Sequence, residues 1–181
     1  MPLNAYEDAC LTEVEGKRIA IEFLRAIGAT DIVENDTKEL QEHGDVRAQI
    51  DNRAYSVEIK TEEENKHGHI FLETWSNLCE EDDGNGKKIL HDKRGWLDSN
   101  RADMLIYICL KTEEIYTIYM YALKRWAFLD GRIYSFEEKK QSKRDQKNVT
   151  HGRVVPIDIL IEEVGMRKYI KDEDGNWKQI K

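Results

Sequence analysis

Cysteine is scarce in this sequence. The chain of 181 residues contains three, Cys10, Cys79 and Cys109, and they form no Cys-x-x-Cys pair. This spacing argues against a disulfide framework and against a structural zinc site, because both rely on paired or clustered cysteines. We therefore expect a protein of a reducing compartment, the cytoplasm.

Long apolar runs are also missing. No stretch approaches the ~18 apolar residues that a membrane-spanning helix needs. The N-terminal sequence MPLNAYED has neither the basic region nor the apolar region of a secretory signal. The sequence thus predicts an intracellular protein without a membrane partner.

Positive charge is the third deficit. Lysine and arginine together number 28 against 36 aspartate and glutamate residues, which gives a formal net charge of −8. A general attraction to nucleic acid or to anionic lipid is therefore excluded. A polyanionic partner would have to bind at a local basic patch.

The residues that are present suffice for one globular domain over 1–181. Apolar residues make up 40% and charged residues 35% of the chain, which favours a packed core under a highly charged surface. Apolar residues at helical spacing predict a helix over 9–27. Alternating residues predict a β-hairpin over 46–50 and 55–60, and a third strand over 69–75 that would complete a meander.

The second half of the chain combines strands with short helices. Continuous apolar runs over 104–110 and 115–121 predict two central strands that are covered on both faces. The other expected elements are a helix over 122–129, a helix that has Pro156 in its first turn and carries Ile157, Leu160, Ile161 and Val164, and a terminal hairpin around Asp174 and Gly175. The segment between the first helix and the hairpin is expected to be a polar loop, and 80–88 an exposed one.

The predicted hairpin gathers three chemically active side chains. Because strand side chains alternate between faces, Asp45, Glu58 and Lys60 share one face. A turn at 52–53 would put Asp45 opposite Lys60, and a turn at 51–52 would put it opposite Glu58. Both registers place the apolar residues on the other face: Val46, Ala48, Ile50, Tyr55, Val57 and Ile59.

Two carboxylates and an ammonium on one surface suit phosphodiester hydrolysis. Asp45 and Glu58 offer the hard oxygen ligands that Mg²⁺ prefers, and the backbone carbonyl of Ile59 can add another. Lys60 would orient or deprotonate the attacking water and stabilise charge on the phosphate, while the ion lowers the pKa of that water. The opposing interpretation is an ion pair between Glu58 and Lys60 on a solvated sheet face, which contributes under about 1 kcal/mol.

The first helix, Asp45 and the segment Glu58-Ile59-Lys60 together resemble the PD-(D/E)XK nuclease superfamily, in particular its phage-type and restriction-endonuclease-like members. Residues 68–75 and 95–103 extend the resemblance, which covers about residues 10–130. Gly44 stands where the family motif has proline, a departure that removes no ligand.

This resemblance implies an α/β fold, with a restriction-endonuclease-like mixed β-sheet flanked by helices. It also implies a DNA endonuclease that uses Mg²⁺, with Mn²⁺ able to substitute, from a phage or mobile element. A homing-type role and a junction-resolving role are both open, and a cut on both strands would favour a homodimer. The alternative is a catalytically inactive nucleic-acid-binding or regulatory protein on the same fold.

Superfamily members often add a helical glutamate that binds or orients the metal. Glu13 lies on the same helical stripe as Ala20 and is favoured for this role over Glu15, which is rotated away. The alternative is that both are solvated helix charges.

One basic segment, residues 139–147, runs against the acidic trend with five positive charges and one negative charge. Its cations would contact DNA phosphates beside the active site: Lys139, Lys140, Lys143, Arg144 and Lys147. The alternative is a solvated loop. Residues 131–181 are accordingly a candidate DNA-contacting C-terminal extension of the domain.

Overall fold

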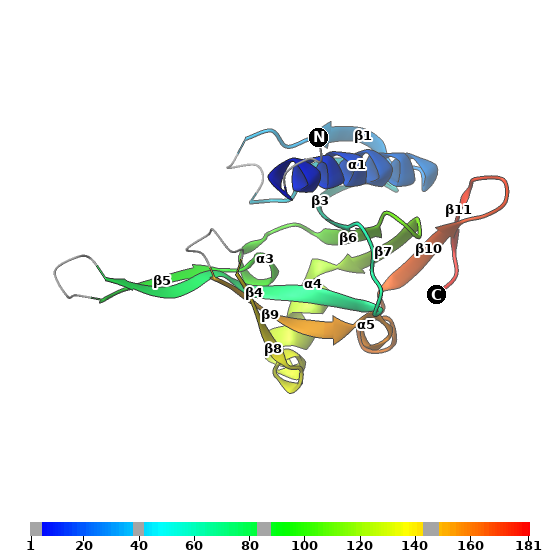
Figure 1. The fold of residues 1–181 in the computed structure, drawn as a ribbon. Coiled ribbons are helices and arrows are strands. Elements are labelled where there is room, and N and C mark those ends of the chain that lie inside the picture. Colours follow the sequence, from blue (N-terminus) through cyan, green and yellow to red (C-terminus); the bar gives the residue numbers. More distant parts are fainter. Residues whose placement is uncertain (1–4, 38–41, 83–87, 143–148) are drawn as a thin grey trace.

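The chain forms two β-sheets with helices packed around them, as seen in the computed structural model (Figure 1). The structure describes residues 5–37, 42–82, 88–142 and 149–181. No helix in these ranges is long and apolar enough to span a membrane.

The larger sheet is mixed. In spatial order its seven strands are β1 (Thr30–Glu34), β2 (Val46–Ile50), β3 (Arg53–Glu62), β6 (Met104–Cys109), β7 (Glu114–Tyr119), β10 (Arg167–Lys171) and β11 (Trp177–Gln179). β3 and β6 are parallel, and the other neighbouring pairs are antiparallel. Every residue of β6 is buried, as its continuous apolar run predicts, because β6 lies inside the sheet and is covered on both faces.

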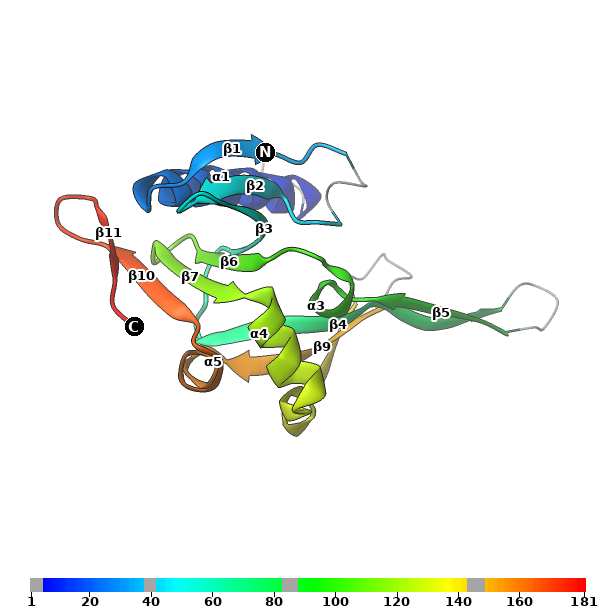
Figure 2. The same cartoon turned by 180° about the vertical axis from the view of Figure 1, so that it is seen from behind.

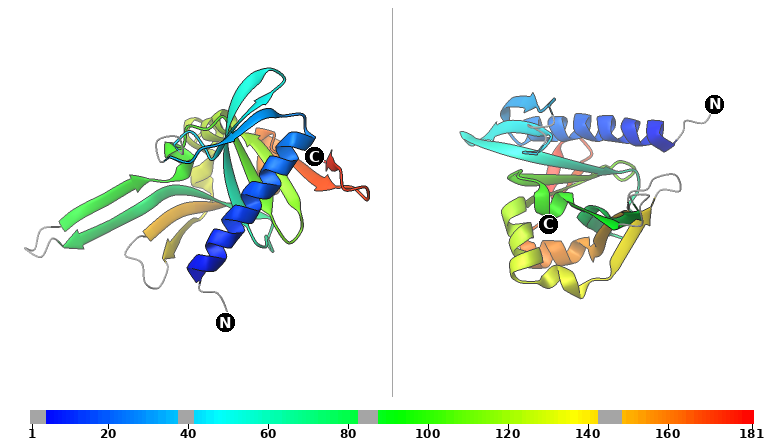
Figure 3. Two further views of the ribbon diagram at one scale, coloured as in Figure 1. Left: turned by 90° about the horizontal axis from the view of Figure 1, so that it is seen from above. Right: turned by 90° about the vertical axis from the view of Figure 1, so that its left-hand side faces the viewer.

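The smaller sheet is antiparallel throughout. In spatial order its four strands are β5 (Lys88–Arg94), β4 (His69–Asp82), β9 (Val149–Pro156) and β8 (Glu138–Ser142). β4 and β5 form a ribbon that extends away from the rest of the molecule (Figure 3).

The two faces of the larger sheet bury different partners. On one face lies α1 (Ala5–Ala26), whose Phe23 and Leu24 pack into one core cluster with Val57 of β3. On the other face lie the smaller sheet, α5 (Ile157–Val164) and α4 (Met120–Lys124), which continues into a π-helical turn (Figure 2). The other helical elements among the described residues are single turns, α3 (Trp96–Ser99) and a 3₁₀ turn (Arg132–Ser135).

The mixed sheet flanked by helices confirms the predicted α/β fold class. The first helix, the hairpin, the central strands β6 and β7, the helices near 122–129 and 157–164, and the terminal hairpin are confirmed as elements. These are the segments with the strongest periodicity, because one face of each is buried.

Four segments differ from the connections and loops that the sequence predicts. β4 does not complete a meander with the hairpin but pairs with β5 and β9 in the smaller sheet. β1 occupies the expected polar loop, and β8 lies within the polar stretch that includes the basic segment. Both are edge strands, so polar side chains are tolerated on them and no apolar alternation marks them. Strand pairing also extends into the expected loop at 80–88, up to Asp82 and from Lys88.

The C-terminal part of the chain contributes strands to both sheets. β8 and β9 belong to the smaller sheet, whereas β10 and β11 extend the larger one next to β7. Residues from 131 onward therefore help to hold the two sheets together.

Candidate active site

The register of the β2–β3 hairpin decides which side chain faces Asp45. Pairing runs from Val46 with Val57 to Ile50 with Arg53, so the turn is at 51–52, and Asp45 directly precedes the first paired residue on the register that runs toward Glu58. Asp51 and Asn52 have φ angles of 51° and 62°, the left-handed conformation that aspartate and asparagine tolerate. The turn chemistry thus selects one of the two registers that the sequence leaves open.

Gly44 brings the chain before β2 against β3. Its φ is +99°, and a Cβ at this position would lie 2.6 Å from the carbonyl oxygen of Val57. Proline, with φ fixed near −65°, could not adopt this conformation, and a larger side chain would collide with the strand. This geometry accounts for glycine at position 44.

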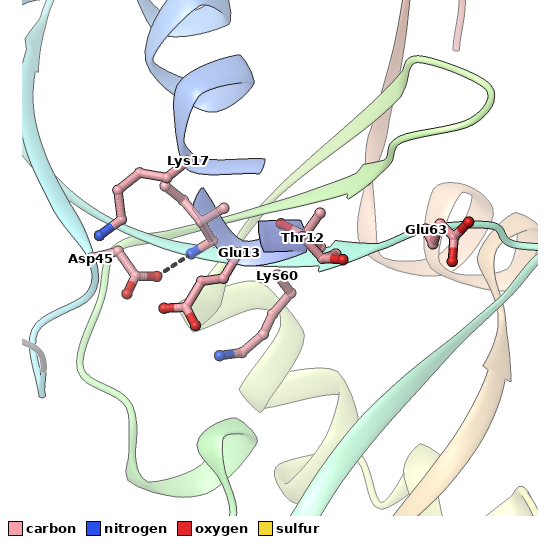
Figure 4. A pocket seen from close by; sticks show the side chains of 8 residues that line it. Thr12, Glu13, Lys17, Asp45, Lys60 and Glu63 are labelled. Atoms are coloured by element: carbon pink, nitrogen blue, oxygen red, sulfur yellow. Dashed lines mark hydrogen bonds between the residues drawn. The ribbon is translucent and has the colours of Figure 1, made fainter. Parts of the chain in front are cut away.

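Asp45 is fixed to β3 at two points. Its backbone N–H donates to the carbonyl of Val57 at 2.8 Å. Its Oδ2 accepts a hydrogen bond of 2.7 Å from the backbone N–H of Ile59 (Figure 4). One carboxylate oxygen is thereby held, and the side chain lines a cavity shared with Lys60.

Glu58 is a buried carboxylate with two polar partners. Its residue exposure is 5%, its Oε2 accepts a hydrogen bond of 2.6 Å from the Asn100 amide, and its Oε1 forms an ion pair with the Lys60 ammonium. Burial raises the pKa of Glu58, the Lys60 charge opposes this rise, and the Asp45 charge adds to it.

Lys60 connects the two sides of the site. Its side chain is partly exposed, and its ammonium lies 5.8 Å from the centre of the Trp96 ring. It lines the cavity beside α1 as well as a second, smaller cavity that Trp96 borders. The ammonium is therefore accessible to a ligand while it remains paired with Glu58.

Gly16 lets α1 approach the end of β3. A Cβ on Gly16 would lie 1.9 Å from Oγ1 of Thr61, so only glycine permits this contact. The close approach puts Glu13, one turn earlier, on a cavity of about 360 Å³ (Figure 4). The cavity is lined by Thr12, Glu13, Lys17, Asp45, Ile59, Lys60, Thr61 and Glu63.

The two helical glutamates lie in different surroundings. Glu13 lines the cavity with Asp45 and Lys60, whereas the carboxylate of Glu15 accepts hydrogen bonds of 3.0 Å and 2.8 Å from the guanidinium of Arg18. This arrangement agrees with the preference for Glu13 as the residue nearer the site. No group of three or more His, Cys, Asp or Glu side chains within the described ranges converges into a ready-made metal cluster.

Asn100 is the polar site residue that sequence reasoning missed. It is buried with 7% exposure, and its Oδ1 accepts a hydrogen bond of 2.7 Å from the N–H of Ala102 while its amide holds Glu58. The Lys124 ammonium donates to the carbonyls of Asp98 and Asn100 at 2.9 Å and 2.5 Å and so holds the α3 segment in place. Asn100 lies forty-two positions from Glu58 in the sequence, and no periodicity marks such a contact.

The close packing of α1 at Gly16 did have a signal in the sequence, namely a glycine in the middle of the predicted first helix.

The basic segment is described only in part. Lys139 forms an ion pair of 2.7 Å with Glu137, and the Lys140 side chain is exposed. Lys143, Arg144 and Lys147 lie outside the described residues. Contact between this segment and DNA stays a prediction.

No protein-family model matches the sequence, and no curated protein matches it. Among solved structures, the chain is similar to that of a bacterial homing endonuclease, I-Ssp6803I, with a TM-score of 0.42 and 13% sequence identity over 76% of this chain and 82% of that one.

Proposed function

We propose that this protein is a metal-dependent DNA endonuclease of the PD-(D/E)XK type. The observation that carries the proposal is the position of Asp45 beside β3, where it lines one cavity with Lys60, together with the ion pair between Lys60 and the buried Glu58. A conformation that only glycine readily adopts holds Asp45 there, so the cluster is built into the backbone.

The donor set fits a hard divalent cation. Asp45, Glu58 and the carbonyl of Ile59 would hold Mg²⁺ or Mn²⁺, with Glu13 as a further ligand from α1. Mg²⁺ uses one or two protein carboxylates and completes its shell with water and phosphate oxygens, so a cluster of three carboxylates is not required. When bound, the ion would polarise the phosphate and acidify the attacking water.

The chain's own residues would divide the remaining work. Lys60 would orient the water and stabilise negative charge on the phosphate oxygens, because its ammonium is accessible beside Glu58. Asn100 would keep Glu58 in one orientation through its amide, as a positioning residue. The basic segment 139–147 would contact the DNA backbone.

The wider role follows from the resemblance alone. With DNA as the proposed substrate, it suggests a homing-type or junction-resolving enzyme of a phage or mobile element that acts in the cytoplasm. A homodimer would supply the second active site for a cut on both strands.

Cleavage of plasmid and branched DNA tests the proposal. We expect cleavage in Mg²⁺ and Mn²⁺, little in Ca²⁺ and none in chelator. Binding of DNA in Ca²⁺ without cleavage under any of these conditions would instead identify a catalytically inactive nucleic-acid-binding or regulatory protein.

A further inference from the structure

A third cavity, larger than the two that Lys60 lines, adjoins the candidate active site. It has a volume of about 750 Å³ and is lined by Glu42, Lys93, Arg94, Trp96, Ser99, Asn100 and Arg101. Three of these residues are cations and one is a carboxylate, in a chain whose formal net charge is −8. We propose that this cavity is a phosphate-binding subsite for the nucleic-acid backbone that flanks the cleaved bond, which rests on the proposed nuclease function.

Two residues join this cavity to the active site. Asn100 lines the cavity and donates its amide hydrogen bond to Glu58. Trp96 also lines it, and the Lys60 ammonium lies over the same ring. A phosphate bound between the cations would therefore be only one side chain away from the carboxylate and ammonium of the site.

Arg94 is positioned to bind an anion. Its guanidinium lies 4.2 Å from the centre of the Trp75 ring, and its side chain is exposed, so a ligand can reach it. Its one ion pair in the described part of the chain is with Asp98 at 3.5 Å, and both side chains are exposed. Such a solvated pair contributes little, so a phosphate that accepts two hydrogen bonds can replace it.

Lys93 and Arg101 complete the basic lining. Over the residues described in the structure, neither side chain has an ion-pair partner, and both are exposed. The backbone N–H of Arg101 donates to the carbonyl of Glu42 at 2.9 Å, which fixes its position at the cavity. Burial lowers the pKa of the nearby Lys124, the Asp98 charge opposes this fall, and the Arg101 charge adds to it.

Binding of a short fluorescent DNA duplex, measured by anisotropy in Ca²⁺ at several salt concentrations, tests the subsite. The triple variant Lys93→Gln, Arg94→Gln, Arg101→Gln should bind at least about tenfold more weakly at low salt. Its salt slope should fall by up to about 2.7 units, because each lost phosphate contact removes roughly 0.9. The single variants Lys93→Gln and Arg101→Gln should each also weaken binding, since within the described ranges neither side chain has an ion pair whose loss could explain the effect.

A matched control changes three exposed cations of the larger sheet, away from the cavity: Arg53→Gln, Arg167→Gln and Lys178→Gln. It alters the net charge by the same amount and should keep the wild-type affinity and salt slope. Equal losses in both triple variants, or no loss in the cavity variant, would overturn the subsite.

The cleavage assay separates this outcome from the fate of the proposed function. If the wild-type protein cuts DNA and the cavity variant binds DNA normally, the subsite is wrong and the nuclease stands. If the wild-type protein binds but never cuts, and the cavity variant alone loses affinity, the subsite stands as a nucleic-acid site without the nuclease. A wild-type protein that neither binds nor cuts DNA overturns both.

Discussion

The side-chain amide of Asn100 donates a hydrogen bond of 2.6 Å to the buried carboxylate of Glu58. The contact joins the segment before β6 to the centre of β3, and it gives one oxygen of Glu58 a fixed partner in the protein interior. A buried carboxylate that lacks this partner would lose both its orientation and part of its stabilisation.

Replacement of Asn100 should therefore affect stability and activity together. Asn100→Ala is expected to lower the free energy of unfolding by about 1–3 kcal/mol, because it leaves a buried polar group unsatisfied. It should also raise the Mg²⁺ concentration needed for half-maximal cleavage. Ser135→Ala is the control, since the exposed Ser135 hydroxyl donates to the carbonyl of Arg132 away from the site. An equal effect of both variants on the metal requirement would show that Asn100 does not position Glu58.

The raised pKa of Glu58 predicts a pH-dependent stability. In the folded protein the carboxyl keeps its proton to higher pH than in the unfolded chain, so its stabilising contribution is full at acid pH and is lost as the pH rises through the folded pKa. Glu58→Gln should thus be more stable than the wild type near neutral pH in chelator, with the difference vanishing at acid pH. Urea unfolding over a pH series measures this.

Glu114 supplies the opposite case as a control. Burial alone would raise the pKa of Glu114, but the Lys168 ammonium and the Tyr116 hydroxyl lower it below its usual value. Its stabilising contribution is present above the unfolded pKa and is lost as the pH falls through the folded pKa. Glu114→Gln should accordingly be less stable than the wild type at neutral pH. The same sign for both variants would contradict the assignment for Glu58.

Much of this site could be predicted from the sequence because strand periodicity fixes the face of each side chain. Alternation sufficed to put Asp45, Glu58 and Lys60 together, and the left-handed turn at 51–52 settled the register. The partner of Glu58 across the fold could not be predicted, since Asn100 reaches it from a loop before another strand. The pairing of β4 with β9 was equally hidden, because alternation specifies a face but not a neighbour.

The substitution Asp45→Asn should separate the structural role of this residue from its role in metal binding. Asp45→Asn keeps an oxygen that can accept from the N–H of Ile59, so the fold and its stability should be nearly unchanged. The loss of the anionic ligand should lower Mg²⁺-dependent cleavage by about a thousandfold or more, given the several kcal/mol that a catalytic ion supplies. Titration calorimetry with Mn²⁺ should show weakened binding. Cleavage near the wild-type rate by a folded Asp45→Asn protein would refute the metal site.

Lys60 should act after DNA has bound. Lys60→Ala is expected to lower the turnover rate by roughly 10²- to 10⁴-fold and to change DNA affinity only a few fold, because its ammonium serves the water and the developing charge. Single-turnover cleavage and anisotropy on the same duplex measure the two effects. A loss of affinity at unchanged turnover would make Lys60 a phosphate clamp instead.

Gly16 offers the last test, because it sets the distance between α1 and the site. Alanine at this position would collide with the side chain of Thr61, and such overpacking typically lowers the free energy of unfolding by about 1–3 kcal/mol. A movement of the helix away from β3 would relieve the collision, and it would also withdraw Glu13 from Asp45 and Lys60. Adding Thr61→Ala removes two of the three colliding atoms, so the double variant should regain part of both stability and cleavage. Recovery of stability without recovery of cleavage would show that the position of Glu13 does not limit the reaction.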